Sequence, residues 1–238
     1  MSRGKILFPI QAVGLGDIIF EMTLIRNFIL EGYKVIWGVR DCFMEGLNQA
    51  YPDVTFINEK LINIDYDNKN DYEDDGARYL PLRWTDSLCG VPYRDCMKSK
   101  YLFFNQDWQI WDTNAQYQRY PEKEQELKYK ILGILLGEKY NLINTRFTSF
   151  ESHRVPIDVN NGYRNIEIST LSGYSLFDWS LVIEGAETIY TVSTSIIYIL
   201  ELLELAAKEI HIYIRRPQEQ NHNNYDYILR KHNYILHD

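Results

Sequence analysis

The residues best suited to chemistry lie near the start of the chain, where an apolar run gives way to glycines and a carboxylate. Residues 6–10 are followed by Gly14-Leu15-Gly16 and then by Asp17, which heads a long amphipathic stretch. Glycines let a backbone turn tightly and approach a ligand closely, and the amides of a helix N-terminus favour a negative group. Gly16 is therefore a candidate phosphate-binding residue, and Asp17 is a candidate for acid–base chemistry. Asp is also a common helix N-cap, so capping alone would explain Asp17.

A second candidate site is a run of hydroxyl side chains, Thr191-Val192-Ser193-Thr194-Ser195. It lies at the predicted end of a strand and on the first turn of a helix, where hydroxyls and free amides can hold a diphosphate without a metal ion. Ser and Thr are also favoured N-caps, which is the alternative explanation. Arg146 follows another predicted strand and could neutralise a leaving diphosphate, or form a surface salt bridge. Ser175 lies in a turn beside aromatic residues that could stack on a base or sugar, and it is a third candidate for nucleotide-sugar binding.

Several common catalytic signatures are absent from the sequence. Gly14-x-Gly16 lacks the third glycine of the dinucleotide fingerprint, so a nicotinamide or flavin cofactor is not supported. The sequence contains no P-loop, no nucleophile elbow and no His-Glu-x-x-His pair. The acidic residues between positions 63 and 78 do not follow the spacing of a calcium loop. We therefore expect neither a metal site nor a bound cofactor.

Composition limits the classes of partner. The net charge of -8 repels phosphate backbones, so nucleic acid is disfavoured unless positive residues gather locally. The three cysteines fit neither a metal-ligand spacing nor a disulfide framework, which suits a reducing compartment. The first apolar run is too short for a signal peptide or a membrane span. These features predict a cytoplasmic protein, in a bacterium or an infected host, with no membrane span.

The order of predicted elements indicates an α/β fold with two similar halves. In the first half, apolar runs and helical periodicity predict a βαβαβ order, which implies a parallel sheet with right-handed crossovers. A helix over residues 121–136 then opens a second series, whose hydroxyl run introduces a helix over residues 196–207. We expect a Rossmann-like domain over residues 1–118 and another over residues 119–238. The predicted elements of the first half are strands at 6–10, 33–39 and 54–57 and helices at 17–31 and 41–50; those of the second half also include strands at 140–147, 165–168, 188–192 and 209–214 and a short helix at 178–184.

Two segments of the first half show no clear periodicity. Residues 63–78 are rich in Asp and Glu, which predicts a solvated loop. Residues 80–112 are aromatic and irregular, and they either cover a crevice or pack between layers.

Two stretches of the sequence, one in each half, resemble a known family. Gly14-Leu15-Gly16-Asp17-Ile18-Ile19, with Leu24-Ile25-Arg26, is similar to the N-terminal motif of GT-B glycosyltransferases related to the ADP-heptose:lipopolysaccharide heptosyltransferases. Trp179, residues 181–190 and the hydroxyl run resemble the stretch where that family binds nucleotide-sugar phosphates. Ser193 replaces the family's Asp in that stretch, and the His that usually follows is absent, so the resemblance does not name the donor sugar.

This resemblance implies a fold and a reaction. The two Rossmann-like domains of the GT-B fold face a central crevice, and the family's proposed general base corresponds to Asp17. The hydroxyl residues of its phosphate motif correspond to Ser193, Thr194 and Ser195. The implied activity is inverting, metal-independent transfer of a sugar from a nucleotide sugar, which is a co-substrate, to a hydroxyl of a saccharide or glycoconjugate.

Two alternatives stay open on the sequence. One is a phage or viral enzyme that glycosylates hydroxymethylated DNA bases, with a basic strip that binds phosphates. The strip would contain Arg78, Arg83, Arg94, Lys98 and Lys100. The other is a non-catalytic α/β module that binds a nucleotide or a sugar, which would have no need for a carboxylate at the glycine loop.

Overall fold

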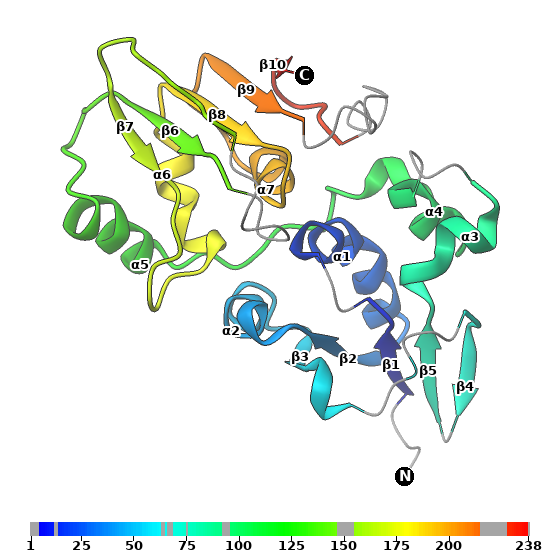
Figure 1. The fold of residues 1–238 in the computed structure, drawn as a ribbon. Helices are drawn as coiled ribbons and strands as arrows, with labels where there is room; N and C mark the ends of the chain where they lie inside the picture. Colours follow the sequence, from blue (N-terminus) through cyan, green and yellow to red (C-terminus); the bar gives the residue numbers. More distant parts are fainter. Residues whose placement is uncertain are drawn as a thin grey trace. The chain divides into compact units, whose positions relative to one another are not determined.

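Two five-stranded sheets, one in each half of the chain, form the framework of the protein (Figure 1). The computed structural model describes residues 5–11, 14–62, 65, 69–74, 76–91, 96–146, 155–214 and 228–237. The chain divides into two units, Met1–Gln118 and Arg119–Asp238. Each unit alternates strands with helices, which confirms the predicted α/β class.

The first sheet has the strand order β3-β2-β1-β5-β4. All neighbouring pairs are parallel except β4 and β5. The chain runs from β1 outward through β2 and β3, and then returns to the other side of β1. The carboxyl ends of β1 and β5 therefore meet where the direction of winding reverses, which is where open α/β sheets bind ligands. The bounds are β1 Lys5–Pro9, β2 Tyr33–Val39, β3 Thr55–Asn58, β4 Tyr72–Asp74 and β5 Ala77–Leu80.

The loop predicted over residues 63–78 is wrong at its end, because β4 and the start of β5 lie there. Contacts across strands hold these short strands in place. Tyr79 stacks on Phe8 of β1 and on Tyr72 of β4, with ring centroids 5.1 and 4.5 Å apart. Arg78 donates two hydrogen bonds to the carboxylate of Asp71. Such pairs form only after the sheet assembles, so the acidic composition concealed them.

Helix α1 (Leu15–Leu30) is the central helix of the first unit, and most of its residues are buried. Its periodic apolar residues explain why it was predicted. The segment over residues 80–112 packs against α1 and is more regular than expected. Tyr101 donates a hydrogen bond to the carbonyl of Phe20 at 2.7 Å, and Trp111 stacks on the ring of Phe20. The helices around it are α2 Asp41–Ala50, α3 Thr85–Cys89 and α4 Cys96–Leu102, with 3-10 turns at Leu82–Trp84 and Trp108–Ile110.

The second sheet is parallel throughout and has the order β10-β9-β8-β6-β7. Strand β6 is followed by β7 on one side, and the chain then crosses to β8 on the other side. The winding therefore reverses between β6 and β8. Strand β10 was not predicted from the sequence. The bounds are β6 Tyr140–Asn144, β7 Arg164–Glu167, β8 Thr188–Val192, β9 Glu209–Tyr213 and β10 Tyr234–His237.

Two helices of the second unit are shorter than predicted. The helix that begins at Pro121 consists of α5 (Pro121–Gln125) and a π-helical turn (Glu126–Ile131). It ends before Gly133, whose φ is +60°. Helix α7 ends at Leu202 (Ile196–Leu202). The amide of Ala206 then donates to the carbonyl of Glu184 at 2.9 Å. Contact with α6 (Ser180–Glu184) therefore overrides the helical pattern after residue 202.

No helix in the described part of the chain combines the length and the apolar character that crossing a bilayer requires.

A buried hydroxyl that ties α1 to the following layer gives a test of the fold. Thr23 donates to the carbonyl of Trp111 at 2.5 Å and accepts from the amide of Asn114. The isosteric change Thr23→Val removes both of these hydrogen bonds, and we expect a loss of about 1 to 3 kcal/mol in the free energy of unfolding. Urea denaturation measures it. Exposed Thr113 bonds only locally to Ile110, so the control Thr113→Val should change stability by less than about 0.5 kcal/mol. Equal losses would contradict the assignment.

Candidate functional site

Asp17 lies at the reversal point of the first sheet. Helix α1 follows β1, and Asp17 is the third residue of that helix. The N-cap position belongs to Gly14, and no side chain caps the helix. The capping role considered for Asp17 is therefore wrong. The carboxylate is about one-third exposed, at 34%, so it is accessible to a substrate while partly shielded from water.

Gly14 and Gly16 shape the turn before Asp17. Gly14 has a φ of +94°, a conformation that other residues adopt only with strain. A Cβ added to Gly14 would overlap the Oδ2 atom of Asp17. The carboxylate thus folds back over the turn, in space that only glycine leaves open. Gly16 is a buried residue in the first turn of α1.

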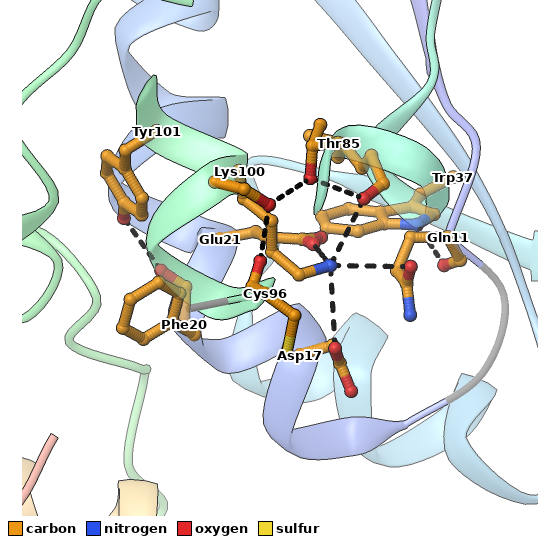
Figure 2. A network of polar contacts seen from close by, with 11 residues as sticks. Gln11, Asp17, Phe20, Glu21, Trp37, Thr85, Cys96, Lys100 and Tyr101 are labelled. Carbon is orange, nitrogen blue, oxygen red and sulfur yellow. Dashed lines mark hydrogen bonds and ion pairs between the residues drawn. The ribbon is translucent and has the colours of Figure 1, made fainter. Parts of the chain in front are cut away.

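The ammonium of Lys100 is buried beside Asp17 (Figure 2). Its Nζ atom lies 2.5 Å from Glu21 Oε1 and 3.4 Å from Asp17 Oδ1. It also donates to Gln11 Oε1 at 3.4 Å and to the carbonyl of Leu82 at 3.3 Å. Gln11 follows β1 and Leu82 follows β5, so the charge sits between the carboxyl ends of the two strands at the reversal point.

Burial dominates the electrostatics of this cluster. The side chain of Glu21 is fully buried and that of Lys100 is 5% exposed. Burial raises the pKa of Glu21 to about 7; Lys100 opposes this shift, and the charge of Asp17 adds to it. Burial alone would lower the pKa of Lys100, but the carboxylates of Glu21 and Asp17 raise it above its ordinary value. Lys100 is therefore cationic at neutral pH, whereas Glu21 titrates there.

Asn144 organises the corresponding edge of the second sheet. It is the last residue of β6, and its amide donates to Thr191 Oγ1 at 3.0 Å and to Thr194 Oγ1 at 3.3 Å. This bridge joins the carboxyl ends of β6 and β8 at the reversal point. Thr194 is half-buried, so its hydroxyl lies at the surface of the edge.

The other two hydroxyl residues differ in their surroundings. The backbone amide of Ser193 donates to the carbonyl of Tyr213 at 2.9 Å. This bond ties the backbone of Ser193 to strand β9 of the sheet. Ser193 is nearly buried, whereas Ser195, the N-cap of α7, is half-buried and makes no side-chain cap bond. Thr194 and Ser195 are thus more accessible to a ligand than Ser193.

The side chains of Arg146 and Ser175 each lie beside a carboxylate. Arg146 lies two residues beyond β6, its side chain is 63% exposed, and its Nε is 3.9 Å from Glu167 Oε1. A pair at this distance and exposure is weak, which leaves the guanidinium able to turn toward a ligand. Ser175 forms a capping box with Asp178, to which its hydroxyl donates at 2.8 Å. The hydroxyl of Ser175 therefore has a structural partner.

Two residues of the basic strip considered for DNA binding are paired with carboxylates. Lys100 is buried against Glu21, and Arg78 is paired with Asp71. Arg83 and Lys98 lie over the rings of Trp84 and Trp108. Arg94 lies outside the described residues.

Sequence reasoning missed two residues of these sites, Glu21 and Asn144, and it missed the role of Lys100. Glu21 carries a signal, because it is a carboxylate four residues after Asp17 on a helix face that is otherwise apolar. A buried carboxylate requires a cation, but only the fold shows that the cation is Lys100. No cluster of three or more His, Cys, Asp or Glu side chains suited to a metal occurs among the described residues.

Comparisons with known proteins give matches at the level of solved structures. No family model matches the chain, and no curated protein matches it. A bacterial iron-containing dodecameric glycosyltransferase, TibC from enterotoxigenic E. coli H10407, is 11% identical with a TM-score of 0.48; the match covers 90% of this chain but 59% of TibC. E. coli heptosyltransferase WaaC with ADP is 12% identical with a TM-score of 0.41, over 88% of this chain and 86% of WaaC.

A third similar structure is the glycosyl transferase family 9 protein from Veillonella parvula DSM 2008. It is 7% identical with a TM-score of 0.48, over 98% of this chain and 86% of that protein. Identities of this size do not transfer site residues, so the site rests on the contacts described above.

The glycine turn gives a matched pair of variants. Gly14→Ala combines an unfavourable φ with overlap on the Asp17 carboxylate, whereas Gly32→Ala has a similar φ of +92° and no atom within 4 Å of the added Cβ. We expect Gly32→Ala to cost about 1 to 2 kcal/mol and Gly14→Ala to cost clearly more. Denaturant titration compares them. Equal costs would show that the carboxylate does not occupy the space beside Gly14.

The raised pKa of Glu21 predicts a pH dependence of stability. Its folded-state pKa of about 7 exceeds the ordinary value of 4.5, so between these pH values the folded state binds more protons than the unfolded state. This group therefore lowers stability as pH rises from 4.5 to 7. Between pH 5 and 7.5 the parent protein should lose on the order of 2 kcal/mol relative to Glu21→Gln. Parallel pH slopes of unfolding free energy in the two proteins would contradict the assignment.

Proposed function

We propose that this protein is a glycosyltransferase that moves a sugar from a nucleotide sugar to a hydroxyl of a saccharide or glycoconjugate. The observation that carries the proposal is the placement of polar groups at both reversal points. One sheet holds the partly exposed carboxylate of Asp17 there, and the other holds the hydroxyl of Thr194 bridged by Asn144. A carboxylate suits proton removal from an acceptor, and neutral hydrogen-bonding groups suit a diphosphate.

On the acceptor side, Asp17 acts as the general base. It takes the proton from the acceptor hydroxyl as the oxygen attacks the anomeric carbon. The bond from that carbon to the diphosphate breaks, and the diphosphate leaves with the electron pair. Because one displacement occurs at the anomeric carbon, the configuration inverts.

On the donor side, the leaving diphosphate gains negative charge as the bond breaks. Thr194 and Ser195 offer hydroxyls, and Arg146 offers a guanidinium that its weak pair with Glu167 does not hold firmly. Charge-assisted bonds from these groups would stabilise the transition state. In this proposal they supply the stabilisation that a metal ion gives in other transferases.

The decisive experiment separates binding from transfer. A panel of nucleotide sugars is first screened by thermal shift, because a ligand that binds the folded state raises its melting temperature. With the selected donor, Asp17→Asn should bind normally by calorimetry while transfer falls by about 100-fold or more. Glu31→Gln, which neutralises an exposed carboxylate at the other end of the same helix, is the control and should retain transfer.

Two outcomes would contradict this proposal. Unchanged turnover in Asp17→Asn would remove Asp17 from the mechanism. Donor binding with neither transfer to any saccharide acceptor nor slow donor hydrolysis would favour a non-catalytic binding module.

A further inference from the structure

We propose that Lys100 and Glu21 are positioning residues for Asp17, and that the protonation of Glu21 sets how strongly Lys100 holds the Asp17 carboxylate. This inference rests on the proposed role of Asp17 as a base. It assigns a function to a buried ion pair that the transfer step itself does not use.

The geometry fixes the ammonium independently of Asp17. Gln11 Oε1 and the carbonyl of Leu82 hold Lys100 Nζ at the edge of the sheet. The backbone carbonyl of Gln11 is itself anchored by Trp37 Nε1 at 2.7 Å. Asp17 lies 3.4 Å from this fixed charge, so its carboxylate has a defined anchor (Figure 2). An anchored base is placed for attack more often than a freely rotating one.

Glu21 competes with Asp17 for the same ammonium. The two residues are four positions apart on α1, so their side chains share one face of the helix. When Glu21 is ionised, its oxygen lies 2.5 Å from Lys100 Nζ, and Asp17 is the more distant partner. When Glu21 is protonated, Asp17 is the remaining anionic partner of Lys100 among the described residues.

This competition makes the anchoring of Asp17 depend on pH. A protonated Glu21 leaves Lys100 to Asp17, which holds the carboxylate in place. An ionised Glu21 is the nearer partner of the ammonium and repels Asp17, which loosens that hold. Burial raises the pKa of Glu21 to about 7, so the change falls near neutral pH. Transfer should therefore fall as pH rises through this range.

Two other titratable groups beside the cluster stay neutral in this range. On α4, Cys96 interacts electrostatically with Lys100 and Asp17, and Tyr101 interacts with Glu21. Burial raises the pKa of the Cys96 thiol to about 11 and that of Tyr101 above its ordinary value. The charges that change or act near pH 7 are thus those of Glu21, Lys100 and Asp17.

A purely structural role is a poor explanation for this pair. Glu21 Oε2 is buried and has no hydrogen-bond partner within the described residues, so the pair does not compensate fully for the cost of burying it. Replacing a buried ion pair by apolar residues of similar volume is often neutral or stabilising. An apolar pair would therefore serve packing as well, but it would not anchor a carboxylate.

Two variants test the inference. Glu21→Gln keeps a polar side chain and removes the titration. The double variant Glu21→Met with Lys100→Met removes both charges together, which avoids the uncompensated buried Glu21 that Lys100→Met alone would leave. The control is Lys98→Met, which removes a lysine from the same helix whose ammonium lies over the ring of Trp108. Folding is checked by circular dichroism and melting.

We expect the folded double variant to lose at least about 10-fold in kcat with unchanged donor affinity, because the base loses its anchor. In Glu21→Gln the change of kcat with pH near pH 7, the limb of the profile, should disappear. Lys98→Met should keep both the kcat of the parent protein and this limb. A folded double variant with the parent kcat, or a limb that persists in Glu21→Gln, would overturn the inference. If the double variant does not fold, the pH profile of Glu21→Gln decides alone.

The result for Asp17→Asn separates the two proposals. If that variant retains transfer, the proposed function fails. If it is inactive while the charge-pair variants behave as the parent protein does, only the positioning role fails.

Discussion

The charge of Lys100 is the constraint on which the arrangement of the first unit depends. An ammonium that is 5% exposed is unfavourable unless acceptors surround it. Those acceptors come from three places: Gln11 after β1, Leu82 after β5, and the carboxylates of Glu21 and Asp17 on α1. The ammonium is satisfied only when all three lie around it. Pairing this charge therefore couples the packing of α4 to the edge of the sheet that presents Asp17.

In the second unit an amide, and not a buried ammonium, joins the strand ends at the reversal point. Its parallel strands also bring the ends of the first strand and a later neighbour together, at β6 and β8. Asn144 joins these ends through neutral hydrogen bonds to Thr191 and Thr194. An amide at this position adds no negative charge beside Thr191 and Thr194, which suits an anionic diphosphate better than a carboxylate would. The carboxylate of one edge and the amide of the other thus match the two different tasks of the proposed transfer.

The success of sequence reasoning follows the kind of interaction involved. Strand β2, helix α2 and strand β8 were predicted with the bounds that the structure has, because each carries its own periodic pattern of apolar residues. Strands β4 and β5 were missed because they depend on stacking and pairing across strands. The helix after Ser195 was extended too far, because the chain after residue 202 bonds to the end of α6. Local patterns predict local structure, and tertiary contacts override them at the ends.

The sequence by itself determined the α/β class and the position of Asp17 after the first strand. These depend on hydrophobic periodicity and on glycine, which act over a few residues. Only the tertiary structure decided that Lys100 is a buried partner of Glu21 and Asp17, and that Asn144 bridges Thr191 and Thr194. Those partners lie far apart in the chain, and a buried charge or amide acquires its partner only when the sheet and helices bring distant segments together.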